Sequence, residues 1–328
     1  MRLFEKANYP FMRWRWRAYI VTAVVLAIGF GGMIRNQVQH GSWLNYGVDF
    51  TGGTLVQVDI TRGQTDVEQL RAAVRAAGHD DWEINSFGDE FVVRMPTFQE
   101  QLGRGAKEIV EEALRPRYQD GFQVVRTEAV GAKVGSELQT RALLAILVSF
   151  LATLIYLAVR FEWRFGLAAI AATAHDILIT LGFLAVIRSE ISLGTVAAFL
   201  TIVGYSLNDT IVVFDRIREN LGKPRHGMSY EQVLDRSINE TLPRTVLTGS
   251  TSLATLLSLF IFGGPVIRDF ALVLMLGILI GTFSSIFVAS PVLNAIQNRW
   301  PHKPKTPEQA VRSRSAAARS TRTARTAV

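Results

Sequence analysis

The chain has 328 residues, of which 49% are hydrophobic and only 19% are charged, and its mean hydropathy is positive. A soluble domain normally carries about 25% charged residues, and here the uncharged residues are concentrated in long stretches. This distribution excludes a single soluble globular domain, a disordered chain and a nucleic-acid-binding domain. The sequence contains no cysteine, which excludes disulfides, thiolate catalysis and cysteine-ligated metal sites. We expect no cofactor.

Six stretches are long and apolar enough to cross a bilayer core, which needs about 20 helical residues. They are predicted at 18–34, 142–159, 165–187, 191–214, 245–262 and 270–293. The first stretch follows a basic segment, as a signal peptide does. Because no small-residue cleavage pattern comes after it, we interpret it as an uncleaved anchor.

The positions of Lys and Arg predict the orientation in the membrane. One side carries 21 basic residues, whereas the short loops on the other side carry two, Arg188 and Arg268. Because basic residues favour the cytoplasmic side, we expect three cytoplasmic segments: 1–17, the loop 215–244 and a disordered basic tail at 299–328. Residues 35–141 then lie in the periplasm. The net charge of +7 follows from this topology, so nucleic acid is not needed to explain it.

The segment 35–141 has the pattern of a small soluble domain. Strands are predicted near 55–60, 82–87, 91–95 and 122–127. Helices that begin with capping boxes are predicted near 65–77 and 97–115. The order βαββαβ is that of a ferredoxin-like domain. It carries no catalytic cluster, so it is either a binding surface or a rigid scaffold.

A glycine-rich segment, Gly-Val-Asp-Phe-Thr-Gly-Gly-Thr at 47–54, lies between the first span and the first predicted strand. Its glycines Gly47, Gly52 and Gly53 permit turns and close backbone approach. We interpret it as a turn that leads into a strand. It is not a phosphate loop, and the chain contains no nucleotide-binding motif. Any work that the protein performs must therefore be driven from elsewhere.

Two aspartates lie inside predicted spans, where an ionisable side chain costs about 2.5–3.5 kcal/mol and is a functional candidate. Asp209 stands between Asn208 and Thr210, which are hydrogen-bond partners of the kind a buried carboxyl group needs. Hydrocarbon disfavours the charged carboxylate, so Asp209 fits a proton relay. The alternatives are a helix-packing hydrogen bond or a carboxyl group that reaches cytoplasmic water. Asp176, which follows His175, is either a second relay group or half of a structural pair.

The span at 245–262 carries a stripe of hydroxyl side chains. The stripe consists of Thr248, Thr251, Thr255 and Ser258. Such a stripe either lines a water path or joins packed helices by hydrogen bonds. Arg244 stands at its cytoplasmic end, as a counter-ion for a carboxylate or as a topological anchor.

One span, a ferredoxin-like domain and five further spans make up half of a resistance-nodulation-division transporter. Within that superfamily, the stretches 47–54 and 203–220 resemble signatures of the SecF side of the SecD/SecF family of bacterial protein-export membrane proteins. Three shorter stretches match as well, at 174–182, 244–248 and 281–289. The resemblance covers about residues 10–298 and leaves out the basic tail.

The resemblance implies an activity and partners. The activity is movement of secretory polypeptides across the inner membrane, assisted by the proton motive force. The implied partners are SecD, which supplies the other six-span half, the SecYEG translocon, the accessory protein YajC and the unfolded polypeptide itself.

The resemblance also implies roles for particular residues. By position, Asp209 matches the family's proton-pathway carboxylate and Arg244 its functional arginine, whereas Asp176 matches a family residue without an assigned role. The family motif after the first span contributes Gly47, Asp49, Gly52 and Gly53.

Other functions fit parts of the pattern. A self-sufficient proton-coupled exporter of small molecules would have to be a homo-oligomer, since six spans are half of the usual set. An intramembrane aspartyl protease would need a Gly-x-Gly-Asp motif, but Ser206-Leu207-Asn208 precede Asp209. A bare assembly scaffold is the remaining alternative. We therefore expect a transport subunit and not an enzyme.

Overall fold

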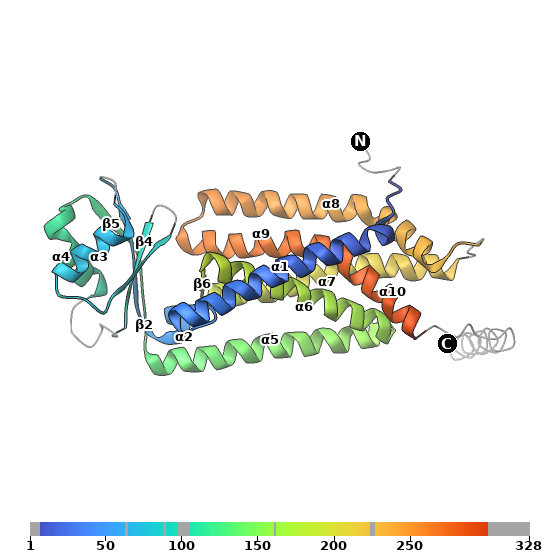
Figure 1. Cartoon of the computed structure of the whole chain (residues 1–328), viewed down its shortest axis with the longest axis horizontal. Helices are drawn as coiled ribbons and strands as arrows, with labels where there is room; N and C mark the ends of the chain where they lie inside the picture. The colour runs from blue at the N-terminus through green and yellow to red at the C-terminus, as the bar shows by residue number, and fades with distance from the viewer. Residues whose placement is uncertain are drawn as a thin grey trace, which may run out of the picture.

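The computed structural model shows a bundle of long helices with a small sheet domain at one end (Figure 1). It describes residues 7–62, 65–87, 90–96, 105–160, 162–223 and 227–300. The helix cap expected at 97–100 and almost all of the tail expected at 299–328 lie outside the described residues. The first long helix begins, and the last one ends, at the end of the bundle opposite the sheet (Figure 1).

Six helical stretches in the described residues are long and apolar enough to cross a membrane. Five of them are single helices: α1 (Phe11–His40), α5 (Ala132–Arg160), α6 (Trp163–Ile187), α7 (Leu193–Gly222) and α8 (Tyr230–Phe262). The sixth consists of α9 (Pro265–Ser284), the π-helical turn η2 (Ser285–Ala289) and α10 (Ser290–Arg299). One long helix precedes the sheet domain and five follow it, which confirms the predicted architecture.

The helices continue beyond the stretches that hydropathy marks. Of the predicted cytoplasmic loop 215–244, residues 215–222 extend α7, and residues 230–244 form one continuous helix with the fifth span, so that α8 has 33 residues. Ser229 caps its start by accepting a hydrogen bond from the Gln232 N–H at 3.3 Å. Hydropathy detects only the part of a helix that lies in hydrocarbon, whereas backbone hydrogen bonding carries on into water.

The sheet domain, residues 53–130, contains four antiparallel strands in the order β3-β4-β2-β5. The strands are β2 (Gly53–Ile60), β3 (Glu83–Phe87), β4 (Glu90–Met95) and β5 (Phe122–Val130). The helices α3 (Val67–Ala76) and α4 (Ala106–Tyr118) separate them in the order βαββαβ. This arrangement confirms the predicted ferredoxin-like domain. A separate parallel pair joins β1 (Asn45–Tyr46), after α1, to β6 (Glu190–Ile191), before α7.

The two faces of the sheet have different neighbours. Apolar side chains of β4, such as Phe91 and Val93, are buried in one core with Leu70 of α3 and Leu114 of α4. Arg94, which follows Val93 in sequence, points to the other face, where it meets the link between α6 and α7. One face of the sheet therefore holds the domain together, and the other faces the helical bundle.

Helix α1 crosses α6 at a contact between two glycines. A Cβ atom added at Gly29 would lie 2.8 Å from the Cα of Gly182, which is too close for the helices to keep their separation. Further along, Asn36 donates a hydrogen bond to the Ala185 carbonyl at 2.8 Å. The first helix is thus held against the later five by close backbone contact and a buried amide.

We expect Gly29→Ala to lower the free energy of unfolding by about 1–3 kcal/mol, because the added methyl group pushes α1 away from α6. Gly31→Ala is the matched control, since a Cβ there meets nothing within 4 Å. The measurement is thermal unfolding of the full chain in detergent, followed by circular dichroism. Equal melting temperatures for the two variants would contradict the proposed contact.

Candidate functional site

Asp176 lies midway along α6 and is fully buried. One of its carboxylate oxygens accepts hydrogen bonds from the hydroxyl groups of Ser206 on α7, at 2.5 Å, and Ser284 on α9, at 2.8 Å. The other oxygen lies 2.9 Å from Nδ1 of His175. Partners from three helices therefore converge on a single carboxyl group inside the bundle.

His175 and Asp176 form the pair that their adjacency suggested. Nε2 of His175 is buried and has no hydrogen-bond partner among the described residues. Within the part of the chain that the structure describes, the imidazole therefore makes its side-chain hydrogen bond through Nδ1. No group of three His, Cys, Asp or Glu side chains in the described parts of the chain is arranged to hold a metal ion.

A small residue, Gly281, allows α9 to approach α7 closely. One turn later, Ser284 of α9 contacts Asp176 of α6. A Cβ added at Gly281 would lie 3.1 Å from the Cβ of Ser206. Directly after Ser284 the helix widens into η2, where the Ser290 hydroxyl donates to the carbonyl oxygen of Ser285 at 3.2 Å. Such π-helical turns are rare and occur frequently at functional sites.

Asp209 lies on α7 one turn after Ser206 and is also buried. Its Oδ2 has no hydrogen-bond partner among the described residues. The charge of Arg244, on α8, acts on this carboxyl group, although no hydrogen bond between the two is present. The fold thus brings Asp209 within electrostatic reach of Arg244, and Ser206 links the same stretch of α7 to Asp176.

The hydrogen bonds expected from Asn208 and Thr210 to Asp209 are not formed. The Asn208 side chain is exposed, and Thr210 is buried at the next position. Adjacent residues of an α-helix lie about 100° apart and do not face each other. Neighbours in sequence are therefore poorly placed to satisfy a carboxyl group on a helix.

Three hydroxyl groups that the sequence analysis missed, on Tyr205, Thr245 and Thr282, belong to α7, α8 and α9, which pack against one another. Their oxygens are buried without a partner among the described residues. A Cβ added at Gly249 would lie 3.3 Å from Thr282 Oγ1 and 4.0 Å from the Tyr205 hydroxyl, so α7, α8 and α9 meet here. Buried polar atoms without partners commonly mark water or a functional site. We call Tyr205, Asp209, Thr245 and Thr282 the polar seam.

The hydroxyl stripe of α8 faces away from the other helices. Thr251, Thr255 and Ser258 are exposed, and each donates to backbone carbonyls of its own helix. The stripe therefore does not join helices of this chain. Together with the exposed Asn208 and Arg244, these three residues form what we call the outward polar face of α7 and α8.

The glycine-rich segment connects the sheet domain to the bundle, and we call residues 47–53 the joint segment. The Gly47 N–H donates to the Ile191 carbonyl at 2.9 Å. Asp49 accepts a hydrogen bond from the Leu193 N–H at 2.8 Å, which places a negative charge at the N-terminus of α7, where it is favoured. Where a turn is predicted, residues Val48–Thr51 form one short helix, α2.

Two glycines of the joint segment have conformations that other residues rarely adopt. Gly52 and Gly53 have φ angles of +74° and +110°. A Cβ at Gly52 would lie 2.7 Å from the Cα of Ala132, at the start of α5, and one at Gly53 would lie 2.7 Å from the Met95 carbonyl oxygen. The glycines therefore allow α5 and β4 to contact the backbone of this segment.

An ion pair crosses from the sheet domain to the bundle beside the joint segment. Arg94 of β4 lies 3.3 Å from the carboxylate of Glu190 on β6 and donates to Asn45 Oδ1 at 3.2 Å. Burial raises the pKa of Glu190, and this effect outweighs the opposing charges of Arg94 and Arg126. The connection thus contains a carboxyl group that gains a proton more readily than an exposed glutamate does.

Comparison with known proteins identifies related families. The family described as "Protein export membrane protein SecD/SecF, C-terminal" matches residues 109–299, and the SecD/SecF GG motif matches residues 41–61. The protein translocase subunit SecF of Gemmatimonas aurantiaca is 46% identical over 92% of this chain and 91% of its own length. Those of Desulfurispirillum indicum and Vibrio alginolyticus are each 42% identical, over 92% and 85% of this chain and 96% and 87% of their own lengths.

Solved structures show the same fold. The crystal structure of SecDF, a translocon-associated membrane protein from Thermus thermophilus, matches 91% of this chain with a TM-score of 0.78 and 38% identity. SecDF in a super-membrane-facing form matches 90% with a TM-score of 0.63 and 37% identity. The chain spans 40% and 39% of those two longer chains. It is therefore similar to part of a longer membrane protein.

We expect Ser206→Ala to lower the free energy of unfolding by about 1.5–3 kcal/mol, because it removes a hydrogen bond to a buried carboxylate. The same substitution should cost little in an Asp176→Ala background, where the acceptor is already absent. Ser258→Ala is the control, since that hydroxyl is exposed and bonds only within α8. Chemical unfolding in mixed micelles measures all four variants. A loss for Ser206→Ala that persists unchanged without Asp176 would exclude the pairing.

We expect Glu190→Gln to become more stable relative to the unsubstituted chain as pH rises above the ordinary glutamate pKa of about 4.3. Folding raises the pKa of Glu190, so the protonated form stabilises the fold and this contribution is lost as pH rises through the raised value. Glutamine mimics the protonated form at every pH. Thermal unfolding between pH 4.5 and pH 8 measures the difference, with the mostly exposed Glu83→Gln as control. The opposite trend would show that attraction to Arg94 outweighs burial.

Proposed function

The chain belongs to the SecD/SecF family of protein export membrane proteins, and from this premise we propose that it is a SecF-type subunit of the Sec machinery. In this role it uses the proton motive force, together with SecD, to promote movement of polypeptides across the bacterial inner membrane. The observation that carries the proposal is the buried Asp209, placed within electrostatic reach of the exposed Arg244.

The outward polar face supports SecD as the partner. Exposing hydroxyl, amide and guanidinium groups to hydrocarbon is unfavourable. We therefore expect a second protein to cover the outward polar face of α7 and α8. The SecDF structures contain this chain's fold within a longer chain, of which it covers about 40%. The family relationship makes SecYEG, YajC and the unfolded polypeptide the further proposed partners.

The proposed orientation places the sheet domain in the periplasm. The strong excess of Lys and Arg on one side of the spans favours the cytoplasm for that side. The start of α1 and the end of α10 lie together at the end opposite the sheet, as an even number of spans requires (Figure 1). In this orientation the Arg244 end of the polar seam faces the cytoplasm.

In the proposed mechanism, a proton from the periplasm reaches Asp209 through the polar seam. Protonation removes the attraction between Asp209 and Arg244, so that α7 and α8 change their contact with each other and with SecD. One charge crossing 100 mV supplies about 2.3 kcal/mol. This energy is enough to bias a conformational change of the transport protein while it holds an already unfolded polypeptide. It is far below the free energy needed to unfold a stable domain.

The joint segment connects the bundle to the sheet domain in this mechanism. Asp49 holds the first turn of α7, while Gly52 lies against the start of α5. A shift of α7 therefore acts directly on the segment from which β2 begins. We assign Asp176 a supporting role in the relay, because two hydroxyl groups and His175 already contact its carboxylate.

We expect Asp209→Asn to lower proton-motive-force-dependent export by at least about tenfold, because the amide cannot exchange the proton. The measurement is translocation of a secretory precursor into inside-out membrane vesicles, with and without the proton gradient. Asp215→Asn, an exposed position further along α7, is the control and should export normally.

Co-purification with SecD separates loss of the relay from loss of assembly, since Asp209→Asn should still bind its partner. Normal gradient-dependent export by this variant would refute the relay. Purification of the chain as an active homo-oligomer without SecD would instead favour a self-sufficient exporter.

A further inference from the structure

Two arginines of the sheet domain lie on the face that meets the helical bundle, and we call this contact the domain interface. Arg94 of β4 lies opposite Leu55, and Arg126 of β5 lies opposite Gln57. Because Leu55 and Gln57 are two residues apart on β2, both arginines are on the same face of the sheet. Their side chains are mostly buried, with exposures of 13% and 17%. Buried charges of this kind require partners.

The bundle places two carboxyl groups near these arginines. Glu190 on β6 lies 3.3 Å from Arg94, and the two form an ion pair across the domain interface. Asp269 lies in the first turns of α9. The charge of Arg126 acts on Asp269 more strongly than the charge of Arg268, its neighbour in sequence. Arg126 and Asp269 are therefore within electrostatic reach of each other from opposite sides of the interface.

This second pair is not formed in the structure. Arg126 donates instead to Glu128, two residues along the same strand, at 2.5 Å. Oδ1 of Asp269 is buried without a hydrogen-bond partner among the described residues, and so is Nε of Arg126. Buried polar atoms without partners are costly. Both groups would therefore gain from a contact with each other.

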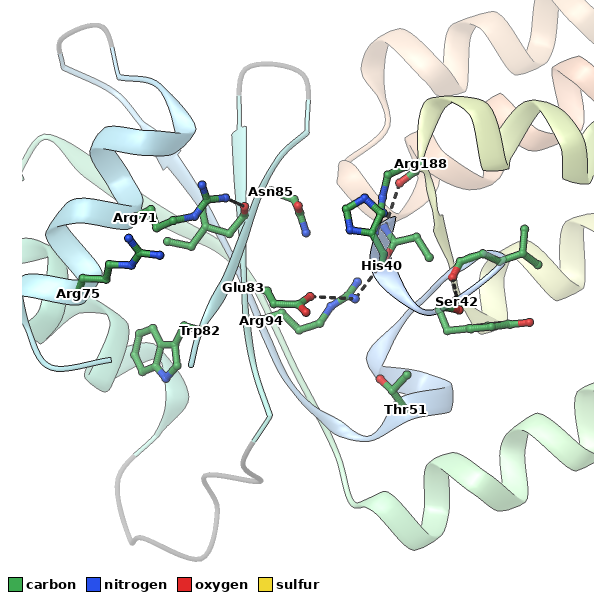
Figure 2. Close-up of a pocket in the computed structure, with 14 residues that line it drawn as sticks. His40, Ser42, Thr51, Arg71, Arg75, Trp82, Glu83, Asn85, Arg94 and Arg188 are labelled. Atoms are coloured by element: carbon green, nitrogen blue, oxygen red, sulfur yellow. Dashed lines mark hydrogen bonds and ion pairs between the residues drawn. The ribbon is translucent and has the colours of Figure 1, made fainter. Parts of the chain in front are cut away.

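The domain interface leaves room for the sheet domain to move against the bundle. A cavity of about 540 Å³ opens beside Arg94 and is lined by residues of both parts, among them Glu83 of β3 and Arg188 after α6. Figure 2 shows the Arg94 side chain extending from β4 toward the bundle, with Glu83 beside it. Because side chains do not fill this opening, the two parts can approach without displacing a packed core.

We propose that Arg126 exchanges its partner Glu128 for Asp269, and that this exchange attaches the sheet domain to α9. In the state described here, Arg126 remains with its own strand. In the alternative state, a second ion pair holds β5 against the first turns of α9. Because α9 also carries Ser284, whose hydroxyl group contacts Asp176, the sheet domain is then connected directly to a helix of the buried site.

The exchange is a property of this chain and is measured without export, so its test does not depend on the proposed function. The chain contains no cysteine, so spin labels are attached at Ala76→Cys on α3 and Ile261→Cys near the end of α8, both exposed positions. Double electron–electron resonance then reports the distance between sheet domain and bundle in the full chain in lipid nanodiscs. We expect two distance populations, of which the shorter has Arg126 paired with Asp269.

Asp269→Asn should decrease the shorter-distance population and Glu128→Gln should increase it, each by about threefold, because one removes the new partner and the other the old one. A general loss of folding cannot shift the population in both directions. Glu108→Gln is the control, since Glu108 is exposed on α4 and belongs to the opposite face of the sheet domain.

Reversal of the charges provides a second measurement. Arg126→Glu alone should abolish the shorter-distance population, because two carboxylates then face each other. Adding Asp269→Arg should restore it, since the pair is re-formed with the charges exchanged.

Three results would overturn the proposal. A single distance that none of these substitutions changes would show that Arg126 keeps Glu128 as its partner. An unchanged distribution in Asp269→Asn, with a shift in Glu190→Gln, would assign the movement to the pair of Arg94 and Glu190. Failure of the charge-reversed double variant to restore the shorter distance would exclude a direct contact between residues 126 and 269.

Discussion

A carboxyl group surrounded by hydrocarbon needs hydrogen-bond donors, a compensating charge or a proton, and the two buried aspartates of this protein meet that requirement differently. Asp176 is contacted by two hydroxyl groups and an imidazole, which fixes three helices around it. Asp209 has an unpartnered oxygen and only the distant charge of Arg244. The first arrangement favours a fixed structure, and the second leaves the carboxyl group responsive to protonation.

The same division between fixed and responsive elements extends to the outer end of the bundle. The glycines of the joint segment permit close backbone contacts that a side chain would block. The segment therefore contacts α5 and α7 directly and leads straight into β2. The ion pair between Arg94 and Glu190 lies beside this connection and contains a carboxyl group with a raised pKa. Movements of the bundle and of the sheet domain are thus coupled through a small set of contacts.

Much of the fold could be predicted from sequence, because apolar length and strand alternation depend on local patterns. The site could be predicted only in part. Asp176, Asp209 and Arg244 are conspicuous, since a charge in or beside an apolar span is costly. Ser206, Ser284 and Thr282 gave no comparable signal, because single hydroxyl residues are common in membrane helices and their partners lie on other helices. The role expected for Asn208 in contacting Asp209 failed for a related reason, since adjacency in sequence is not adjacency on a helix.

The length of α8 has a mechanical consequence. At 1.5 Å per residue its 33 residues extend over about 50 Å, with Pro243 inside the helix as a point where it can bend. Near its start, Asp235 accepts a hydrogen bond from the Met12 N–H and Asn239 from the Tyr9 N–H, so that end is anchored to the first segment of the chain. Arg244 is the fifteenth of these residues, a little short of the middle, and directly follows Pro243. A small rotation about that point would move the far tip through an arc about 1.3 times that of the near one.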